Sequence, residues 1–375
     1  MKKITYIFGP GRVSKLKKEN EYAKDFFYGF HHVSKDKNFE TQIIEINPFS
    51  PTKNVFIKLF QKLDIIFNKL TFLRFHIHEI FKKNNFRKII TSNLIIFTND
   101  QIALSFFPVL LLKKKLNSIV IVMGLFKQQK NLKSYQRFLR PKIIHLFIKS
   151  VDKLVFLGKP EFNYALQNFP YFKDKFYFLP FSVDFEFWSE NNKKFNKQTS
   201  NNILFVGNDS NRNYEFVKKL PSLLSDFEFT FITKQIKKIE NGKNVNLISG
   251  DWYSESLNDI ELRKIYQNAF LTIIPIKNTI QPSGQSVTLQ SMSCGTPVLI
   301  SKFNGFWDET LFNNNENIFI IEDFDYVKWS ELIVKIYKEK SNLNSVAKKG
   351  SDLIRDNYGI DQFNKEFMKL IKNYL

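Results

Sequence analysis

The sequence contains a single cysteine, Cys294, so the chain cannot form an internal disulfide bond. This composition is typical of a reducing compartment, and we expect a cytoplasmic protein. No run of about 18 uninterrupted apolar residues occurs, so no membrane-spanning helix is predicted. The basic N-terminus begins like a signal peptide, but its apolar run, Ile4 to Phe8, is too short for one.

Motifs that bind metals or activate nucleophiles are also missing. The five histidines form no HExxH motif, and His76 and His78 are two residues apart, which places them on different faces of a helix. No nucleophile elbow GxSxG occurs. We therefore predict no metal site and no cofactor.

Acidic residues are absent from residues 101–150, which hold ten lysines and arginines. Residues 1–150 hold 28 basic and 9 acidic residues, whereas residues 151–375 hold 28 and 27. A codon bias towards lysine would affect both halves alike and does not explain this asymmetry. Residues 109–150 mix basic and apolar side chains, which predicts contact with an anionic membrane surface. A soluble anionic partner would match the charge equally well.

Apolar runs of strand length alternate with helical patterns along the whole chain. This order predicts α/β architecture with parallel sheets covered on both faces. The predicted strands are 3–8, 41–46, 89–90, 94–97, 119–123, 151–156, 175–179, 203–206, 227–232, 244–249, 271–275, 298–301 and 318–321. Helices are predicted at 22–32, 54–81, 287–294 and 361–375. The polar stretch 189–200 predicts a linker between two domains.

The stretch QPSGQSVTLQSMSCGTPVLIS, residues 281–301, passes from a turn to helical spacing and then to an apolar strand. Ser283 or Ser286 is predicted to cap the helix, and Gly295 stands where a helix commonly ends. A helix that opens with small polar residues presents unpaired N–H groups and a partial positive charge, which favours a phosphate. An ordinary capped helix of an α/β unit is the alternative.

Two further segments place glycine after a strand. In ILFVGNDSNRNY, residues 203–214, Gly207 allows close backbone approach and Arg212 has the geometry to bind a phosphate in a bidentate manner. Ligands of open parallel sheets bind at the carboxyl ends of the strands, which favours a site over a solvated surface loop. In YIFGPGRVSK, residues 6–15, Gly9 and Gly11 form a similar turn, but Ser14 breaks the GxGxxG pattern.

Four segments in this order resemble the C-terminal half of GT-B glycosyltransferases of family 4. They are LPFSVDFEFW (179–188), ILFVGNDSNRNY (203–214), ELRKIYQNAFLTIIP (261–275) and PSGQSVTLQSMSCGTPVLIS (282–301). The family patterns are Gly-Val-Asp, Val-Gly-Arg, Leu-x-x-x-Tyr-x-x-Ala and Glu-Ala-Met-Ala-Cys-Gly-Thr-Pro-Val. The resemblance covers about residues 150–305. It implies two Rossmann-like domains facing a cleft, residues 1–190 and 201–360, with a helix at 361–375 returning to the first.

By the same resemblance, the turn before the helix at 287–294 binds the diphosphate of a nucleotide sugar. The implied donor-binding residues are Gly207, Ser283, Gly284, Gln285, Ser286, Val287 and Gln290. Arg212 and Lys234 would stabilise the leaving diphosphate as catalytic residues, and Gly9 and Gly11 would lie in the cleft of the N-terminal domain.

The chain departs from the family pattern at its carboxylates. Two glutamates of the pattern fall on Pro282 and Gln290, and an arginine falls on Asn208. The donor sugar therefore does not follow from the resemblance, and altered or lost activity is compatible with these departures. Restoring glutamate at position 290 is expected to be tolerated.

The resemblance implies a hexosyltransferase-like, retaining enzyme that needs no metal. Its acceptor would be a glycan or lipid-linked hydroxyl in cell-surface glycan, lipopolysaccharide or glycolipid synthesis, reached from the inner face of the membrane. A sugar-nucleotide epimerase of the same fold is an alternative, although the acidic and histidine residues it uses are not found. A basic nucleic-acid-binding protein is another, but no RRM or OB motif occurs, so no nucleic acid partner is expected.

Overall fold

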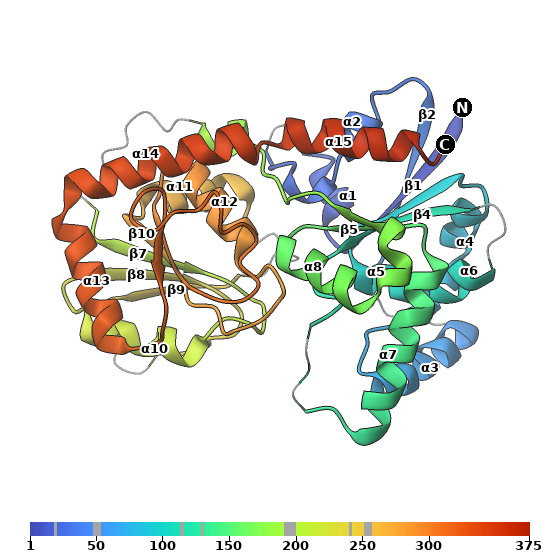
Figure 1. Ribbon diagram of the computed structural model, residues 1–375, viewed down its shortest axis with the longest axis horizontal. Helices are drawn as coiled ribbons and strands as arrows, with labels where there is room; N and C mark the ends of the chain where they lie inside the picture. Colours follow the sequence, from blue (N-terminus) through green and yellow to red (C-terminus); the bar gives the residue numbers. More distant parts are fainter. Residues whose placement is uncertain are drawn as a thin grey trace. The chain divides into compact units, whose positions relative to one another are not determined.

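The computed structural model describes residues 1–18, 21–47, 54–112, 116–127, 129, 131–190, 200–239, 242–250 and 257–375. The chain forms two compact units, each with its own parallel sheet (Figure 1). The first unit comprises residues 1–17, 26–180 and 364–375, and the second comprises residues 18–25 and 181–363. The chain passes from the first unit to the second between Pro180 and Phe181. The predicted N-terminal domain ends ten residues later, at residue 190.

The sheet of the first unit has six parallel strands in the order β2-β1-β3-β4-β5-β6. The central strands are almost wholly buried because branched apolar residues occupy both of their faces. The strands are β1 (Lys2–Phe8), β2 (Phe39–Glu45), β3 (Leu94–Phe97), β4 (Asn117–Val122), β5 (Lys153–Phe156) and β6 (Phe176–Phe178).

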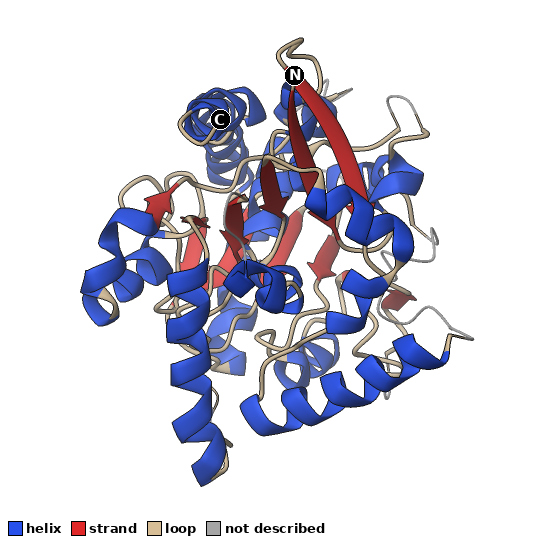
Figure 2. Cartoon of the chain, turned by 90° about the vertical axis from the view of Figure 1, so that its right-hand side faces the viewer, coloured by secondary structure: helices blue, strands red, loops and turns tan. Residues whose placement is uncertain are grey.

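Short helical elements and longer helices surround this sheet (Figures 1 and 2). They are α1 (Arg12–Lys15), η1 (Asp25–Phe27), α2 (Phe30–Val33), α3 (Val55–Thr71), η2 (Ile77–Phe81), α4 (Lys83–Ile90), α5 (Asp100–Ser105), α6 (Phe107–Leu112), α7 (Ser134–Ser150), α8 (Lys159–Asn168) and η3 (Pro170–Lys175). The last helix, α15 (Ile360–Lys372), belongs to this unit from Asn364 onwards. No helix among the described residues is both long and apolar enough to cross a membrane.

Three local predictions in the N-terminal part of the chain are wrong. The helix predicted at 54–81 ends at Thr71, because Phe72 has a φ angle of 55°, and helical structure resumes only as η2. The helix predicted at 22–32 is interrupted, because Tyr28 and Gly29 have φ angles of 45° and 79°. Glycine is needed at position 29, where a Cβ would lie 3.0 Å from Cδ1 of Phe367. The apolar pair predicted as a strand at 89–90 instead ends α4, since the preceding residues continue a helix.

Helix α3 has an unusual orientation, with its apolar side turned to solvent. Its buried residues are Ile57, Asp64 and Thr71, which are seven residues apart and form one stripe. Its exposed large apolar residues are Val55, Phe56, Leu59, Leu63, Ile65, Ile66, Phe67 and Leu70. Apolar spacing of this kind normally marks the side of a helix that faces the core.

Polar contacts hold α3 in this orientation. Asp64 accepts hydrogen bonds from the backbone N–H of Ile77 at 2.8 Å and pairs with Nδ1 of His78 at 2.7 Å. From α7, Gln136 Nε2 donates to the carbonyl of Lys69 at 2.7 Å and Arg140 Nη1 donates to the carbonyl of Phe72 at 2.6 Å. The helix is therefore attached through its polar stripe and its C-terminal carbonyls.

Raising the pH is expected to weaken this attachment. Burial alone lowers the pKa of His78, but hydrogen bonds with Asp64 and Glu79 outweigh it and raise the pKa to about 9. The stabilisation is therefore complete below the unfolded value near 6.5 and is lost as the pH rises through 9, at most roughly 3 kcal/mol. Chemical unfolding between pH 6 and 10 should show this loss in the wild type and not in His78→Gln. Parallel pH profiles for the two proteins would contradict the assignment.

The sheet of the second unit also has six parallel strands, in the order β12-β11-β10-β7-β8-β9. The strands are β7 (Asn202–Val206), β8 (Glu228–Ile232), β9 (Val245–Ile248), β10 (Leu271–Ile274), β11 (Val298–Ser301) and β12 (Phe319–Ile321). The helices are α9 (Phe185–Ser189), α10 (Tyr214–Leu223), α11 (Asp259–Asn268), α12 (Gln285–Ser293), α13 (Tyr326–Lys338) and α14 (Lys340–Asn357). The order of the strands places α10 and α13 on one face, and α11, α12 and α14 on the other (Figure 1).

An aromatic cluster fills the core between this sheet and the pair α10 and α13. Phe216 stacks on Tyr326 with ring centroids 4.6 Å apart and meets Trp329 edge-on at 5.1 Å. Ile203 and Phe205 of β7 project into the same cluster. This packing buries one face of β7, the strand that leads into the loop of Arg212.

Candidate functional site in the second unit

The loops after β7 and β10 pair with each other at the carboxyl edge of the second sheet. The N–H of Asn213 donates to the carbonyl of Pro275 at 2.9 Å, and the N–H of Lys277 donates to the carbonyl of Asn211 at 2.7 Å. Between these bonds, Arg212 forms an isolated antiparallel bridge with Ile276. The pairing brings the predicted site residues of 203–214 next to those of 281–290.

The side chain of Asn211 joins the same loops. Its Nδ2 donates to Oγ of Ser283 at 2.5 Å and to Oε1 of Gln281 at 3.0 Å. Both Asn211 and Ser283 are buried. Asn211 was not predicted from the sequence. It stands beside Arg212 in a run of small polar residues, and only the fold shows which residues of this run face the turn that contains Ser283.

The side chain of Arg212 is buried between two glycines, with 2% of its surface exposed. A Cβ at Gly207 would lie 2.5 Å from Nε of this arginine, and a Cβ at Gly284 would lie 3.3 Å from its Nη1. The absence of side chains at both glycines is what makes room for the guanidinium. This assigns Gly207 a different role from the predicted one, since its open side faces Arg212.

The guanidinium of Arg212 is incompletely bonded. Nη1 lies 3.2 Å from Oδ2 of Asp209, but outside hydrogen-bonding geometry. Both Nε and Nη1 are buried without a hydrogen-bond partner among the described residues. Because buried polar groups in folded proteins are nearly always bonded, two unsatisfied donors on a cation indicate a place for an acceptor that is bound from outside.

Helix α12 begins beside this arginine. Its N-cap is Gly284, with φ 80°, and no side chain caps it, so the prediction that Ser283 or Ser286 is the cap is wrong. Gln285, Ser286 and Val287 form the first turn. The N–H groups at the start of an α-helix point out of its N-terminal end. A Cβ at Gly284 would meet Cγ2 of Ile274 at 2.9 Å, so this glycine serves the turn itself.

The backbone of Lys234 is bonded to the side-chain amide of Asn208, the residue that stands where the family pattern has an arginine. Oδ1 of Asn208 accepts from the backbone N–H of Lys234 at 2.7 Å, and its Nδ2 donates to the carbonyl of Gly250 at 2.6 Å. Asn208 thus ties together the ends of β7, β8 and β9. The Lys234 side chain is exposed at this edge of the sheet.

Gln290 is engaged by protein groups that the sequence did not predict. Its Nε2 donates to Oδ2 of Asp25 at 2.8 Å, and its Oε1 accepts from the hydroxyl of Tyr266 at 3.4 Å. Asp25 also accepts from Nε1 of Trp188 at 2.9 Å and from the backbone N–H of Asp184 at 2.6 Å. The structure therefore gives Gln290 of α12 an internal contact, and its role in donor binding stays a prediction.

The carboxyl group of Asp25 is titratable and buried. Burial raises its pKa to about 7, against the opposing effect of the hydrogen bonds from Asp184, Gln290 and Trp188. Asp25 ends the segment 18–25, which belongs to the second unit and whose described residues are bonded to it, for example by a 3.0 Å hydrogen bond from the N–H of Ala23 to Oδ2 of Asp259. No local pattern around Asp25 signals this role, because its partners are more than 150 residues away.

In the first unit, two glycines and two buried acidic residues lie at the carboxyl edge of the sheet. Gly9 and Gly11 follow β1, and Gly11 has φ 86°. Asp100 accepts from the backbone N–H of Met123 at 2.8 Å, and Glu161 accepts from that of Phe126 at 3.3 Å. Burial raises the pKa values of these acids to about 6 and about 8. Both carboxyl groups organise the loop after β4, and neither was predicted.

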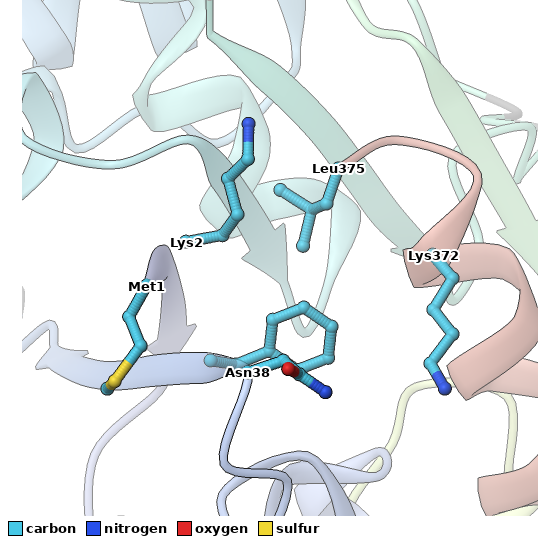
Figure 3. A pocket seen from close by; sticks show the side chains of 6 residues that line it. Met1, Lys2, Asn38, Lys372 and Leu375 are labelled. Carbon is cyan, nitrogen blue, oxygen red and sulfur yellow. The ribbon is translucent and has the colours of Figure 1, made fainter.

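A hollow of about 420 Å³ lies elsewhere in the first unit, at the edge of its sheet (Figure 3). It is lined by Met1, Lys2, Asn38, Phe39, Lys372 and Leu375. It contains none of the predicted site residues. No group of three or more His, Cys, Asp or Glu side chains in the described part of the chain is arranged to hold a metal ion.

No protein-family model and no curated protein matches this sequence. Solved structures match along the whole chain. Sucrose-phosphate synthase from Thermosynechococcus elongatus has 11% identity, a TM-score of 0.66, and coverage of 100% of this chain and 99% of its own. The Anabaena protein HepE in complex with UDP-glucose has 8% identity, a TM-score of 0.63 and coverage of 100% of both chains. A glycosyltransferase from Rickettsia africae has 10% identity, a TM-score of 0.59, and coverage of 100% and 98%.

These similarities show the fold. Like the matched structures, the chain has the GT-B fold of two Rossmann-like α/β units, each built on a parallel sheet. The predicted fold class is confirmed. The predicted site residues divide between the units, with Gly9 and Gly11 in the first and the others in the second.

Proposed function

We propose that this chain is a glycosyltransferase that moves a sugar from a nucleotide diphosphate sugar to a hydroxyl acceptor. The observation that carries the proposal is the buried guanidinium of Arg212, with two unsatisfied donors, beside the uncapped N-terminus of α12. A diphosphate supplies the acceptor oxygens and the negative charge that both features favour. The binding of UDP-glucose by HepE, which shares the fold, supports this choice of ligand.

In the proposed reaction, the bond between the anomeric carbon and the diphosphate oxygen breaks, and a bond from that carbon to the acceptor oxygen forms. Negative charge develops on the leaving diphosphate, where Arg212 and the first turn of α12 stabilise it, with Lys234 as a second cation. The acceptor oxygen attacks the anomeric carbon from the face that the diphosphate leaves, so the configuration is retained. Its proton passes to the leaving phosphate, so no separate base is required. The step is redox-neutral and uses no cofactor.

The acceptor and its location complete the proposal. We propose a hexose donor and a glycan or lipid-linked acceptor in cell-surface glycan, lipopolysaccharide or glycolipid synthesis, met at the inner face of the membrane. The excess of basic residues in 1–150 supports an acceptor that lies on an anionic surface. No nucleic acid partner is part of this proposal.

Binding of a diphosphate should stabilise the folded chain. We expect one of UDP, GDP or ADP, or its sugar conjugate, to raise the melting temperature, by an amount equivalent to ~2.7 kcal/mol at a hundred times the dissociation constant, whereas the monophosphate CMP should give a smaller shift. The matching nucleoside without phosphate is the control and should give a much smaller shift. Equal shifts with nucleoside and nucleotide, or no shift with any compound, would contradict the diphosphate site. Release of the nucleotide from its sugar conjugate then measures turnover.

A further inference from the structure

The outward face of α3 has the character of a lipid-binding surface rather than of an ordinary protein surface. We name the α3 face by the exposed apolar residues that share one side of the helix, Val55, Phe56, Leu59, Leu63, Ile66, Phe67 and Leu70. Val55 is 80% exposed, Leu59 55% and Ile66 51%. Single exposed apolar residues are common, but a continuous row along a helix of 17 residues marks an interaction surface.

The orientation of α3 is fixed by the fold and does not result from loose packing. Its inward stripe carries Asp64, which is bonded to His78 and Ile77, and Asn68, whose Oδ1 accepts from the N–H of Phe75 at 2.6 Å. Turning the apolar side inward would break these bonds and leave Asp64 without its partners. The exposure of the apolar side is therefore enforced by buried polar contacts.

The charge of α3 indicates what covers its apolar side. Lys58, Lys62 and Lys69 are exposed and lie together on one flank of the apolar row, at helical spacings of four and seven residues. The only acidic residue of the helix, Asp64, is buried. An exposed apolar row flanked by lysines and free of exposed acid is the pattern of a helix that lies in the interface of an anionic bilayer.

We propose that the α3 face docks this protein on the surface of an anionic lipid bilayer. Helix α3 lies in the plane of the interface, with its apolar row among the acyl chains and the lysine flank against the lipid phosphates. Neighbouring α7, which is bonded to the end of α3 and lies beside it (Figure 1), adds exposed Phe138 with Lys142 over its ring at 3.7 Å. The docking surface goes beyond the proposed function, because it requires no nucleotide sugar.

This surface differs from the one that the sequence predicts. The basic residues singled out in 109–150 are Lys113, Lys114 and Lys115, which lie outside the described residues, and Arg137 and Arg140 of α7. Arg137 is exposed, whereas Arg140 is buried and donates to the carbonyl of Phe72. Within that range, β4 is buried in the unit, Leu111 and Leu112 at the end of α6 are exposed, and α7 contributes the pair Phe138 and Lys142. Helix α3 lies before the range and combines apolar exposure, basic charge and a fixed orientation.

Sedimentation of the full chain with vesicles tests the proposal. We expect binding to phosphatidylcholine vesicles that contain phosphatidylglycerol and much weaker binding to phosphatidylcholine alone. Leu59→Gln/Ile66→Gln should lower the partition coefficient at least about tenfold, because two apolar side chains are lost from the interface. The control Leu223→Gln/Val327→Gln changes two exposed apolar residues of the second unit and should bind as the wild type does.

The lysine flank is tested in the same assay. Charge reversal of Lys58, Lys62 and Lys69 to glutamate should lower the partition coefficient on the order of 100-fold. Reversal of Lys338, Lys348 and Lys349, which are exposed in α13 and α14, is the control with the same change in net charge. Equal losses in the two triple variants would show that total charge, and not the α3 face, governs binding, and would overturn the proposal.

A label reports directly on the position of α3. The single native cysteine is buried, so Ile66→Cys can be labelled selectively with an environment-sensitive dye. Its emission should shift to the blue with anionic vesicles, and a label at Leu223→Cys should not respond. Two outcomes would overturn membrane docking. One is the absence of this blue shift. The other is that vesicles do not bind and the chain instead self-associates, with the self-association abolished by Leu59→Gln/Ile66→Gln. Nucleotide binding measured by melting temperature is expected to be the same in all these variants, so failure here is distinct from failure of the proposed function.

Discussion

Replacing Arg212 with methionine is expected to leave the melting temperature unchanged or higher, and to lower turnover of the nucleotide sugar about 10²- to 10³-fold. Methionine fills the space between Gly207 and Gly284 without carrying a charge. Among the described residues the guanidinium has two buried donors without a hydrogen-bond partner, each a cost of about 1–3 kcal/mol that the substitution removes. In the transition state the same guanidinium would stabilise the leaving diphosphate, and that contribution is lost.

Arg263 provides the matched control for this experiment. It is also a buried arginine of the second unit, but its Nη1 donates to the carbonyl of Phe187 at 2.6 Å and pairs with Glu190. Arg263→Met should therefore lower the melting temperature, whereas the shift induced by the nucleotide remains. If Arg212→Met destabilised the chain as Arg263→Met does and still bound the nucleotide fully, Arg212 would be a structural residue and not part of the site.

Replacing Gln290 with glutamate is expected to destabilise the chain by about 3–5 kcal/mol at pH 8, because two carboxylates in a buried site cannot both ionise without a large penalty. The prediction from the family pattern was that this change is tolerated, but the structure places the side chain 2.8 Å from the carboxyl group of Asp25. The hydrogen bond that Gln290 donates to Asp25 is lost at the same time. Chemical unfolding of the two proteins at pH 8 measures the difference.

The effect should depend on pH in a defined direction. The pKa of Asp25 is already raised to about 7, and a neighbouring carboxylate raises the pKa of the pair further. A raised folded pKa stabilises the chain below the unfolded value near 4, and this stabilisation is lost as the pH rises through the folded pKa. The difference in unfolding free energy between Gln290→Glu and the wild type should therefore shrink as the pH is lowered from 8 to 5.

The double variant Asp25→Asn/Gln290→Glu tests whether the destabilisation comes from the interaction between positions 25 and 290 or from a general loss of packing. The amide introduced at position 25 would donate to the carboxylate introduced at position 290. This exchange of acid and amide should recover part of the loss, with a coupling of about 1–3 kcal/mol in a double-mutant cycle. The recovery should be incomplete, because Trp188 Nε1 and the N–H of Asp184 both donate to the side chain at position 25. Additive losses in the two single variants would show that positions 25 and 290 are not coupled.

Local patterns predicted most of the sheet strands and the end of α12 correctly. The strand predicted at 298–301 is β11, and Gly295 has the positive φ of 67° that its place after α12 requires. Such features follow from hydrophobic spacing and from backbone restrictions of single residues, both of which are written in the sequence. The helix cap was wrong, because several small polar residues in succession are equally able to cap and only packing against Ile274 selects Gly284.

The candidate site was predictable in its location but not in its contacts. Strand order and glycine positions place Arg212 and the turn 283–286 at the carboxyl edge of one sheet. The burial of Arg212, its bridge to Ile276 and the bonds from Asn211 to Ser283 depend on how two loops pair in space. The partnership of Asp25 with Gln290 joins residues far apart in the chain, and no local pattern records it.

By itself, the sequence determined that α3 is a helix with an apolar side, that residues 1–150 carry the excess positive charge, and that two α/β units follow one another. These properties depend on spacing, composition and order alone. Only the tertiary structure decided which side of α3 is buried and whether Arg212 is satisfied. The reason is physical: Asp64 pairs with His78, so the side of α3 that carries Asp64 turns inward, whereas Arg212 is enclosed between two glycines, where Nε and Nη1 have no hydrogen-bond partner in the described part of the chain. Burial and hydrogen-bond satisfaction belong to the packed chain as a whole, and a one-dimensional pattern does not contain them.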